Sequence, residues 1–393
     1  MPKPTRSRNP KDSDLPDDRH FHEGTAAATA RYGRFNLAVV GNTGVGKSSL
    51  VNAVFRRDFA KVGKGMPVTK GIDYYHDDSL GIWDFEGFEI GTSESPKATL
   101  RRHLEAIKGR PKDQQIDVVW YCVLHNADRL TGPDIQMIQE LDAAELPVIL
   151  VMTKVPWQKN PVTGKYRAPE STEIFKQWLE APVDPNGEPI DLPLQHVALT
   201  STQNSKGKGA GHGLGDLVEK TLELAPNSSR DSFRVAQQIN LPWKREIARR
   251  QIAAASAAAG AAAATPLPVA DAVTLAPIQL AMMGKISHIY GLELASMMSS
   301  TALAQLAAQL SGQALARSFV KLVPGIGSVV NATVATAITA AIGEGWVRLC
   351  ETVHTGKVRP DEITDVLDQF GPTVVSVAKE WLRSKSPGAT PQP

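Results

Sequence analysis

The eight residues from Gly41 to Ser48 constrain this chain more than any other segment. They read GNTGVGKS, directly after the apolar run Asn36–Val40 and directly before a helical pattern, SSLVNAVF. Glycines let the backbone turn tightly and point its N–H groups inward, and the start of a helix adds partial positive charge. The segment therefore predicts a strand–loop–helix unit whose loop binds phosphate.

The motif also assigns roles to single residues. Lys47 is expected to reach the β- and γ-phosphates of a nucleoside triphosphate, and the Ser48 hydroxyl to bind Mg²⁺. The remaining phosphate contacts are expected from the loop and the first helical turn: Gly41, Asn42, Thr43, Gly44, Val45, Gly46 and Ser49.

Residues 32–226 predict an α/β domain, because apolar runs alternate with helical patterns. Several runs are almost continuously apolar, as expected of parallel strands covered by helices on both faces. Helices are expected at Lys47–Phe55 and Asp134–Leu141, and strands at Phe35–Val40, Leu80–Asp84, Val118–Leu124, Pro147–Met152 and Gln195–Leu199.

The sequence changes character after the segment APNSSRD, at residues 225–231. Residues 232–384 are rich in Ala, Leu, Met and Ser and predict a second, all-helical domain. Residues 1–31 and 385–393 are polar and proline-containing, and we expect both to be disordered tails.

Composition excludes some functions. The net charge of +2 gives no reason to expect nucleic acid as a partner. The N-terminus has no apolar signal segment, and two cysteines, Cys122 and Cys350, are too few for a disulfide framework. We therefore expect a cytoplasmic protein with reduced, buried thiols.

With these motifs in order, the chain resembles the translation-factor-related GTPases, most closely the Era-, septin- and immunity-related-GTPase-like branch, with its Ras-like fold. The stretch WDFEG, at residues 83–87, resembles the D-x-x-G of switch II. The resemblance implies that Asp84 holds a Mg²⁺-bound water and that the Gly87 amide touches the γ-phosphate. Thr69, in the preceding GMPVTK, resembles the switch I threonine that closes over Mg²⁺ and the γ-phosphate.

The base-binding motif departs from this family. Thr153 and Lys154 match the opening of [NT]-K-x-D, but Pro156 stands where the family has an aspartate that accepts two hydrogen bonds from guanine. Losing such an acceptor costs about 1.5–3 kcal/mol, so guanine specificity is open and an ATPase is an alternative. Thr200 and Ser201 resemble the last motif, which backs the base.

A second departure concerns hydrolysis. Ras-like enzymes orient the attacking water with a glutamine directly after D-x-x-G, whereas this chain has Phe88. We therefore expect slow intrinsic hydrolysis of GTP to GDP, accelerated by a partner or by a homodimer formed through the GTPase domain. A pseudo-GTPase that binds nucleotide without turnover is the alternative.

The helical half resembles an uncharacterised domain fused to bacterial GTPases and often described as membrane-associated. The resemblance covers residues 266–343 and is carried by APIQLAMM, at 276–283, and LVPGIGSVV, at 322–330. Apolar residues recur every four positions from Ile326 to Ile342, which fits a buried core helix and a membrane hairpin equally. A hairpin would place the protein at the inner membrane, where nucleotide would drive remodelling or scaffold assembly.

Overall fold

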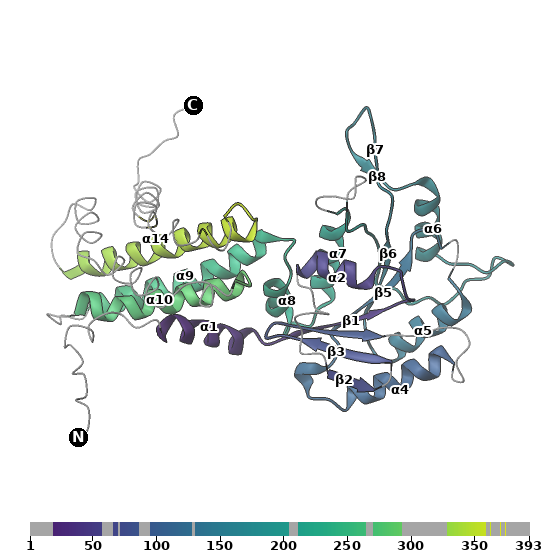
Figure 1. The fold of residues 1–393 in the computed structure, drawn as a ribbon, viewed down its shortest axis with the longest axis horizontal. Coiled ribbons are helices and arrows are strands. Elements are labelled where there is room, and N and C mark those ends of the chain that lie inside the picture. The colour runs from purple at the N-terminus through teal and green to yellow at the C-terminus, as the bar shows by residue number, and fades with distance from the viewer. Residues whose placement is uncertain are drawn as a thin grey trace, which may run out of the picture. The chain divides into compact units, whose positions relative to one another are not determined.

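The computed structural model describes residues 19–56, 66–69, 71–85, 95–127, 130–203, 211–264, 270–292 and 328–358, and the single positions 362, 370 and 374. The chain forms two compact units (Figure 1). One is an α/β unit from Tyr32 to Asn240. The other is a helical unit that combines the N-terminal residues up to Arg31 with the chain from Leu241 onward.

The α/β unit is built on a seven-stranded sheet in the order β2-β3-β4-β1-β5-β6-β9. Strand β1 pairs in parallel with β4 and β5, and β6 in parallel with β5 and β9, whereas β2 and β3 form an antiparallel edge. The strands are β1 (Phe35–Val40), β2 (Met66–Thr69), β3 (Ile72–His76), β4 (Leu80–Phe85), β5 (Val118–Leu124), β6 (Val148–Thr153) and β9 (His196–Leu199).

Helices cover both faces of this sheet, and neighbouring residues of β5 show how. The indole of Trp120 donates a hydrogen bond to Thr221 in α7 (Leu214–Leu224), 3.0 Å away. The next residue, Tyr121, points to the opposite face and donates to Asp134 in α5 (Gly132–Ala143), 2.7 Å away. α2 (Lys47–Phe55) and α8 (Arg230–Ala236) lie on the face of α7, and α4 (Pro96–Lys108) and α6 (Glu170–Glu180) lie on that of α5.

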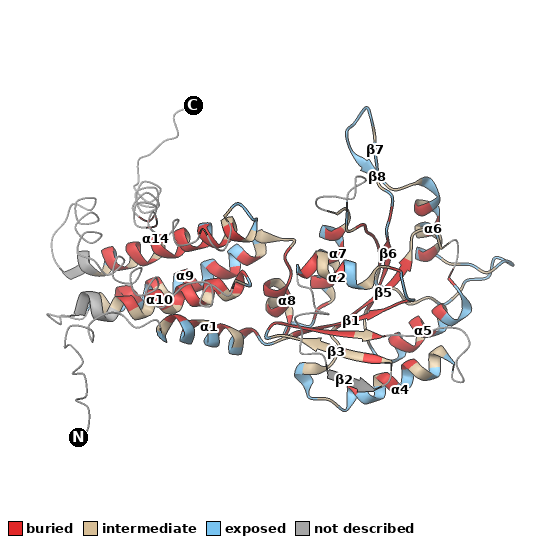
Figure 2. Ribbon diagram, in the orientation of Figure 1, coloured by how far each residue is buried: buried red, intermediate tan, exposed pale blue. Residues whose placement is uncertain are grey.

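The local sequence explains where these elements begin. All six residues of β1 and of β6 are buried, as continuous apolar runs predict for strands covered on both faces (Figure 2). Helix α5 begins with a capping box in which Thr131 and Asp134 satisfy each other's backbone N–H groups. The predicted strand and helix positions are therefore confirmed for the central sheet.

The sequence analysis did not identify several smaller elements. The antiparallel strands β2 and β3 extend one edge, and a short hairpin of β7 (Gln158–Lys159) and β8 (Tyr166–Arg167) follows β6. A 3-10 turn, η2 (Lys112–Gln114), which precedes β5, was not predicted either.

The helical unit packs α9 (Leu241–Ala264) against α14 (Ser328–His354) and α10 (Ala270–Ile289). α9 and α14 approach closely, since a Cβ added at Gly343 would lie 2.6 Å from Ile252. Polar groups also join the helices: the indole of Trp346 donates to the Ser287 hydroxyl, 2.9 Å away. The two cysteines are free and buried, one in each unit.

The N-terminal segment differs from the disordered tail expected for residues 1–31. Arg19–Tyr32 forms helix α1, in which Phe21 and Ala28 are almost fully buried. The backbones of α1 and α10 lie very close, because a Cβ added at Gly284 would overlap the Phe21 carbonyl oxygen. Tertiary packing against α10 therefore stabilises a helix whose own sequence carries little apolar surface.

The boundary between the units also differs from the one expected at residues 226–232. Helix α8 belongs to the α/β unit: the ring of Phe233 packs 4.7 Å from Phe35 and 6.3 Å from Phe55. The division falls instead after Asn240, before α9 begins.

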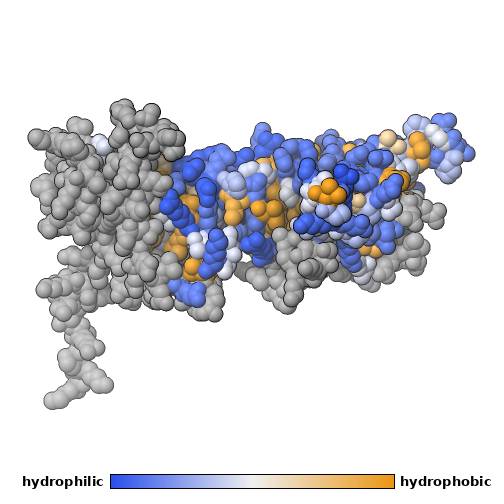
Figure 3. Space-filling view, turned by 90° about the horizontal axis from the view of Figure 1, so that it is seen from above, coloured by the Kyte–Doolittle hydropathy of each residue, from blue (hydrophilic) through white to orange (hydrophobic). Residues whose placement is uncertain are grey.

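The apolar residues of α14 lie against other helices of the unit. Val334, Ile338 and Ile342, which belong to the predicted four-residue repeat, are at most 7% exposed. Ile326 lies outside the described residues. Within the described part of the chain, no helix combines the length and apolar character needed to cross a bilayer. On the face shown in Figure 3, hydrophilic side chains predominate among the described residues.

Candidate nucleotide site

The loop predicted to bind phosphate lies at the carboxyl end of β1 and leads directly into α2. Gly41 (φ 141°), Gly44 (φ 82°) and Gly46 (φ 104°) adopt backbone conformations that side chains with a Cβ rarely adopt. The N–H of Leu50 donates to the Gly46 carbonyl, 2.9 Å away, so the amides of residues 47–49 come before the helical hydrogen-bond ladder. Such a helix start presents amides and a positive dipole to an anion.

Two charged side chains, those of Lys47 and Asp84, lie beside this loop. The ammonium of Lys47 donates to the Gly41 carbonyl, 2.8 Å away. Asp84 lies near the end of β4 and pairs in register with Val39 of β1. Burial raises the pKa of the neighbouring Cys122 thiol to about 12, which the Lys47 charge opposes and the Asp84 charge reinforces. The charges of the lysine and the aspartate therefore both act on this thiol beside the loop.

The oxygen groups beside the loop suit a hard divalent cation. Ser48 is exposed at the first turn of α2, and Asp84 supplies a carboxylate from the adjacent strand. Mg²⁺ in phosphate sites is held by one or two such side chains together with water and phosphate oxygens, rather than by a full protein cage. The donor set therefore fits Mg²⁺ as a third component beside a bound nucleotide.

The base-binding motif is tied directly to the phosphate loop. The buried Thr153 hydroxyl lies 2.5 Å from the Val45 carbonyl and 3.0 Å from the Val123 carbonyl. The ammonium of Lys154 donates to the Gly44 carbonyl, 2.7 Å away. The end of β6 thus supports the loop at two successive residues.

A cavity of about 230 Å³ opens on the base side of this arrangement. Its lining includes Lys154, Pro156, Trp157, Ser201, Gln203 and His212. Thr200 does not line it: its hydroxyl donates to the Met152 carbonyl, 3.1 Å away, and its own carbonyl accepts from the N–H of Val155. Thr200 therefore holds the loop after β6, whereas Ser201 faces the cavity.

Three residues with predicted roles lie partly or wholly outside the described residues. Thr69 ends β2 and pairs with Ile72, but its side chain lies outside the described residues. Gly87 and Phe88 also lie outside them. The roles expected of these residues remain predictions.

Sequence reasoning missed Cys122, Trp157 and His212 as parts of this site. Cys122 packs against Gly41, and Trp157 and His212 come together in the base-side cavity. Trp157 directly follows the departure at Pro156, which is a local signal. Nothing in the sequence pattern near His212 indicates this placement.

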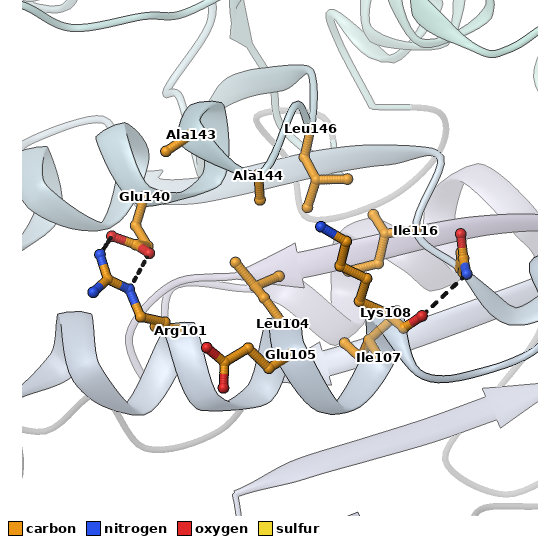
Figure 4. Close-up of a pocket in the computed structure, with 11 residues that line it drawn as sticks. Arg101, Leu104, Glu105, Ile107, Lys108, Ile116, Glu140, Ala143, Ala144 and Leu146 are labelled. Atoms are coloured by element: carbon orange, nitrogen blue, oxygen red, sulfur yellow. Dashed lines mark hydrogen bonds and ion pairs between the residues drawn. The ribbon is translucent and has the colours of Figure 1, made fainter.

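A second cavity, of about 330 Å³, lies between α4 and α5 (Figure 4). Ile116 and Leu146 line it and come just before β5 and β6. It therefore lies at the amino ends of these parallel strands, whereas the phosphate loop follows the carboxyl end of β1. Arg101 closes one end with hydrogen bonds of 2.6 and 2.8 Å to Glu140, and the cavity is separate from the nucleotide site.

A mostly parallel sheet, a glycine-rich loop between β1 and α2, and a lysine and an aspartate converging beside it define a P-loop nucleotide-binding protein. Comparison with protein families agrees: residues 36–154 match a family described as 50S ribosome-binding GTPase. Residues 228–370 match a domain of unknown function, DUF697. The chain therefore contains a P-loop GTPase domain similar to those of EngB, Era and Der, followed by a separate region that matches DUF697.

Individual relatives are distant. The chain is 28% identical over 115 residues to a probable GTP-binding protein EngB from Mycoplasmopsis agalactiae, covering 29% of this chain and 58% of the relative. It is 26% identical to EngB from Thermotoga maritima, covering 43% and 87%. It is 28% identical to GTPase Der from Bifidobacterium longum, covering 56% and 41%. The chain thus spans only part of the length of these relatives.

The similarity to solved structures is weak. A crystal structure of Era from Aquifex aeolicus bound to GDP.AlF4− is 17% identical, covers 50% of this chain and 58% of that one, and superposes with a TM-score of 0.29.

Proposed function

We propose that this chain is a Mg²⁺-dependent GTPase that hydrolyses GTP slowly and acts as a nucleotide switch. The observation that carries the proposal is the convergence of Lys47 and Asp84 beside the loop after β1. A cation and a metal-binding carboxylate next to inward-facing amides suit a triphosphate–Mg²⁺ complex, whose charge needs both.

Each residue has a distinct part in this proposal. Lys47 would leave the Gly41 carbonyl for the β- and γ-phosphates, and the amides at the start of α2 would bind the same phosphates. Ser48 and Asp84 would hold Mg²⁺, with Thr69 joining them from β2. When bound, the metal neutralises phosphate charge.

Slow turnover follows from the residue after the switch II motif. Phe88 has no polar group with which to orient a water molecule, so intrinsic hydrolysis lacks the help that a glutamine supplies in Ras-like enzymes. A second copy of the α/β unit would supply the missing group. The switch would act through Thr69 and the loop after Asp84, which the γ-phosphate would reposition, and would report to the helical unit.

The test is single-turnover phosphate release from GTP with Mg²⁺, measured over a range of protein concentrations. The proposal predicts slow release that accelerates with protein concentration and is lost in Ser48→Ala and Asp84→Asn. Ser228→Ala, at an exposed serine between α7 and α8 and outside the phosphate loop, is the matched control. Binding without any release would instead identify a pseudo-GTPase, and fast release independent of concentration would contradict the proposed slow switch.

A further inference from the structure

The exposed apolar side chains of this chain are concentrated in one short stretch. Residues 158–191, which we call the hairpin surface, comprise the β7–β8 hairpin, α6 and the turn that follows α6. Among the described residues, four large apolar side chains are exposed, and all four belong to this surface: Val162 (91%), Tyr166 (42%), Ile174 (59%) and Val183 (43%). Single exposed apolar residues need no explanation, whereas a concentration of them in one part of a protein marks a surface that binds another molecule.

The tip of the hairpin is an ordered turn that holds Val162 in solvent. The hairpin projects from the α/β unit (Figure 1) and is exposed along its length (Figure 2). The side-chain oxygen of Asn160 accepts from the N–H of Val162, 2.9 Å away, and the Asn160 N–H donates to the Lys165 carbonyl, 2.8 Å away. In β8, the ring of Tyr166 packs with its centroid 4.3 Å from that of His212. A turn that is ordered before binding loses little conformational entropy in a complex.

Charge divides the hairpin surface into two parts. The hairpin carries three cations, Lys159, Lys165 and Arg167, and no acidic residue. Residues 168–191 carry one lysine, which pairs with Glu180 at 3.7 Å. The same residues carry six carboxylates, those of Glu170, Glu173, Glu180, Asp184, Glu188 and Asp191. A cationic hairpin therefore adjoins an anionic helix and turn.

A groove of about 750 Å³ lies where the two parts meet. Lys159 and Arg167 line it from the hairpin, and Glu170 and Glu173 line it from the start of α6. No ion pair joins these four side chains to one another or to another described residue. Their charges are therefore available to an incoming surface that carries charges of both signs.

We propose that the hairpin surface is the site at which two copies of this chain associate about a twofold axis. In a twofold contact the same patch occurs on both partners. A patch with a cationic part beside an anionic part then places unlike charges opposite each other twice. The hairpin of one copy lies in the groove of the other, with Lys159 and Arg167 facing the partner's Glu170 and the partner's Glu173. The exposed apolar side chains become buried between the copies and form the apolar part of the contact.

A second copy fits this surface better than a polyanion does. A nucleic acid or an anionic membrane would pair with the hairpin, but the six adjoining carboxylates would repel it. The inference deepens the proposed function, which calls on a second copy of the α/β unit without naming its surface, and rests on that function only where association is linked to hydrolysis. β7 follows the carboxyl end of β6, where Lys154 contacts the phosphate loop, so the second copy docks at the nucleotide-binding end of the sheet.

The experiment is sedimentation velocity of the full chain without nucleotide, so that its result does not depend on nucleotide binding. Wild type should form a dimer. Lys159→Glu with Arg167→Glu, and separately Glu170→Lys with Glu173→Lys, should each weaken association at least about a hundredfold, because like charges then face each other. An equimolar mixture of these two variants should associate again as a heterodimer, since their charges are complementary. Lys108→Glu with Lys112→Glu, at exposed lysines outside the hairpin surface, is the matched control and should dimerise like wild type.

A further variant tests the apolar part of the contact. Val162→Ser should weaken association roughly tenfold, as expected when a buried valine is lost. A wild type that stays monomeric up to about 1 mM, charge-reversed variants that associate like wild type, or a mixture that stays monomeric would each overturn the inference and leave nucleotide binding intact. If the dimer forms and is lost as expected, but phosphate release does not accelerate with protein concentration, the surface stands and only the acceleration in the proposed function is refuted.

Discussion

The hydroxyl of Thr153 lies 2.5 Å from the Val45 carbonyl oxygen, which joins the end of β6 to the phosphate loop. It also lies 3.0 Å from the Val123 carbonyl, and the residue is only 4% exposed. A buried side chain of the base-binding motif therefore supports the phosphate loop.

Replacing Thr153 by valine should loosen this connection. The change keeps the side-chain shape but removes the one hydroxyl proton that the two carbonyls share, at a cost of about 1–3 kcal/mol in unfolding free energy. Denaturant unfolding measures that loss, and triphosphate affinity should fall with it. Thr153→Ser restores the hydroxyl and should recover most of both; equal behaviour of valine and serine would contradict this role.

Gly41 should tolerate no side chain. Its φ of 141° is unfavourable for other residues, and a Cβ would overlap the Cys122 carbonyl oxygen. Gly41→Ala should therefore destabilise the chain by about 1–3 kcal/mol and weaken triphosphate binding.

The matched control for Gly41→Ala is Gly215→Ala in α7, where a Cβ meets no atom within 4 Å. There alanine should stabilise by about 0.5–1 kcal/mol, because glycine is a poor helix former. Thermal unfolding of both variants measures the two changes in stability. A change in the same direction for both variants would contradict this prediction.

The Asp117 carboxyl should cause the free energy of unfolding to fall as the pH rises from about 4 to about 6. Burial raises the pKa of its carboxyl from 3.8 to about 6, opposed by hydrogen bonds from Asn36 and Ser229. In this pH range the folded chain binds more protons than the unfolded chain. The contribution of the protonated carboxyl to the free energy of unfolding is therefore fully present below pH 3.8 and lost above about pH 6.

Asp117→Asn isolates this contribution, since its amide oxygen still accepts from Asn36 and carries no charge. The stability of the variant relative to wild type should rise by about 2–3 kcal/mol from pH 4 to pH 7. Denaturant unfolding across that range measures the difference; two parallel pH profiles would contradict the buried-carboxyl interpretation.

Helix α1 should depend on a glycine of α10. A side chain at Gly284 would overlap the Phe21 carbonyl, so Gly284→Val should separate α1 from α10 at a cost of about 1–3 kcal/mol. Faster tryptic cleavage at Arg31 would report the separation. Ala257→Val, an exposed position on α9, adds the same β-branched side chain without a clash and should leave cleavage unchanged. Unaltered cleavage in Gly284→Val would contradict this packing.

The central sheet could be predicted from the sequence because of where its strands lie. β1, β5 and β6 are covered on both faces, so their residues are continuously apolar and easily recognised. β3, with the sequence IDYYH, is half-exposed at the antiparallel edge and gives no such run. The hairpin strands β7 and β8 are exposed throughout and carry no apolar pattern.

The site divides in a similar way. Gly41, Lys47 and Ser48 lie within one eight-residue motif, so a local pattern predicts them, and Asp84 lies in a recognisable strand. Helix α1 and His212 were missed because each depends on contacts with residues far away in the chain: Gly284 for the helix, and Ser201 and Trp157 for the histidine.

The most direct test of the account is calorimetric titration of wild type and Lys47→Ala with GTP and Mg²⁺. Removing the ammonium leaves phosphate charge unpaired, so affinity should fall roughly a hundredfold or more. Lys112→Ala, an exposed lysine before β5 and outside the described lining of the base-side cavity, should bind like wild type. Unchanged affinity in Lys47→Ala would contradict the assignment of this loop as the nucleotide site.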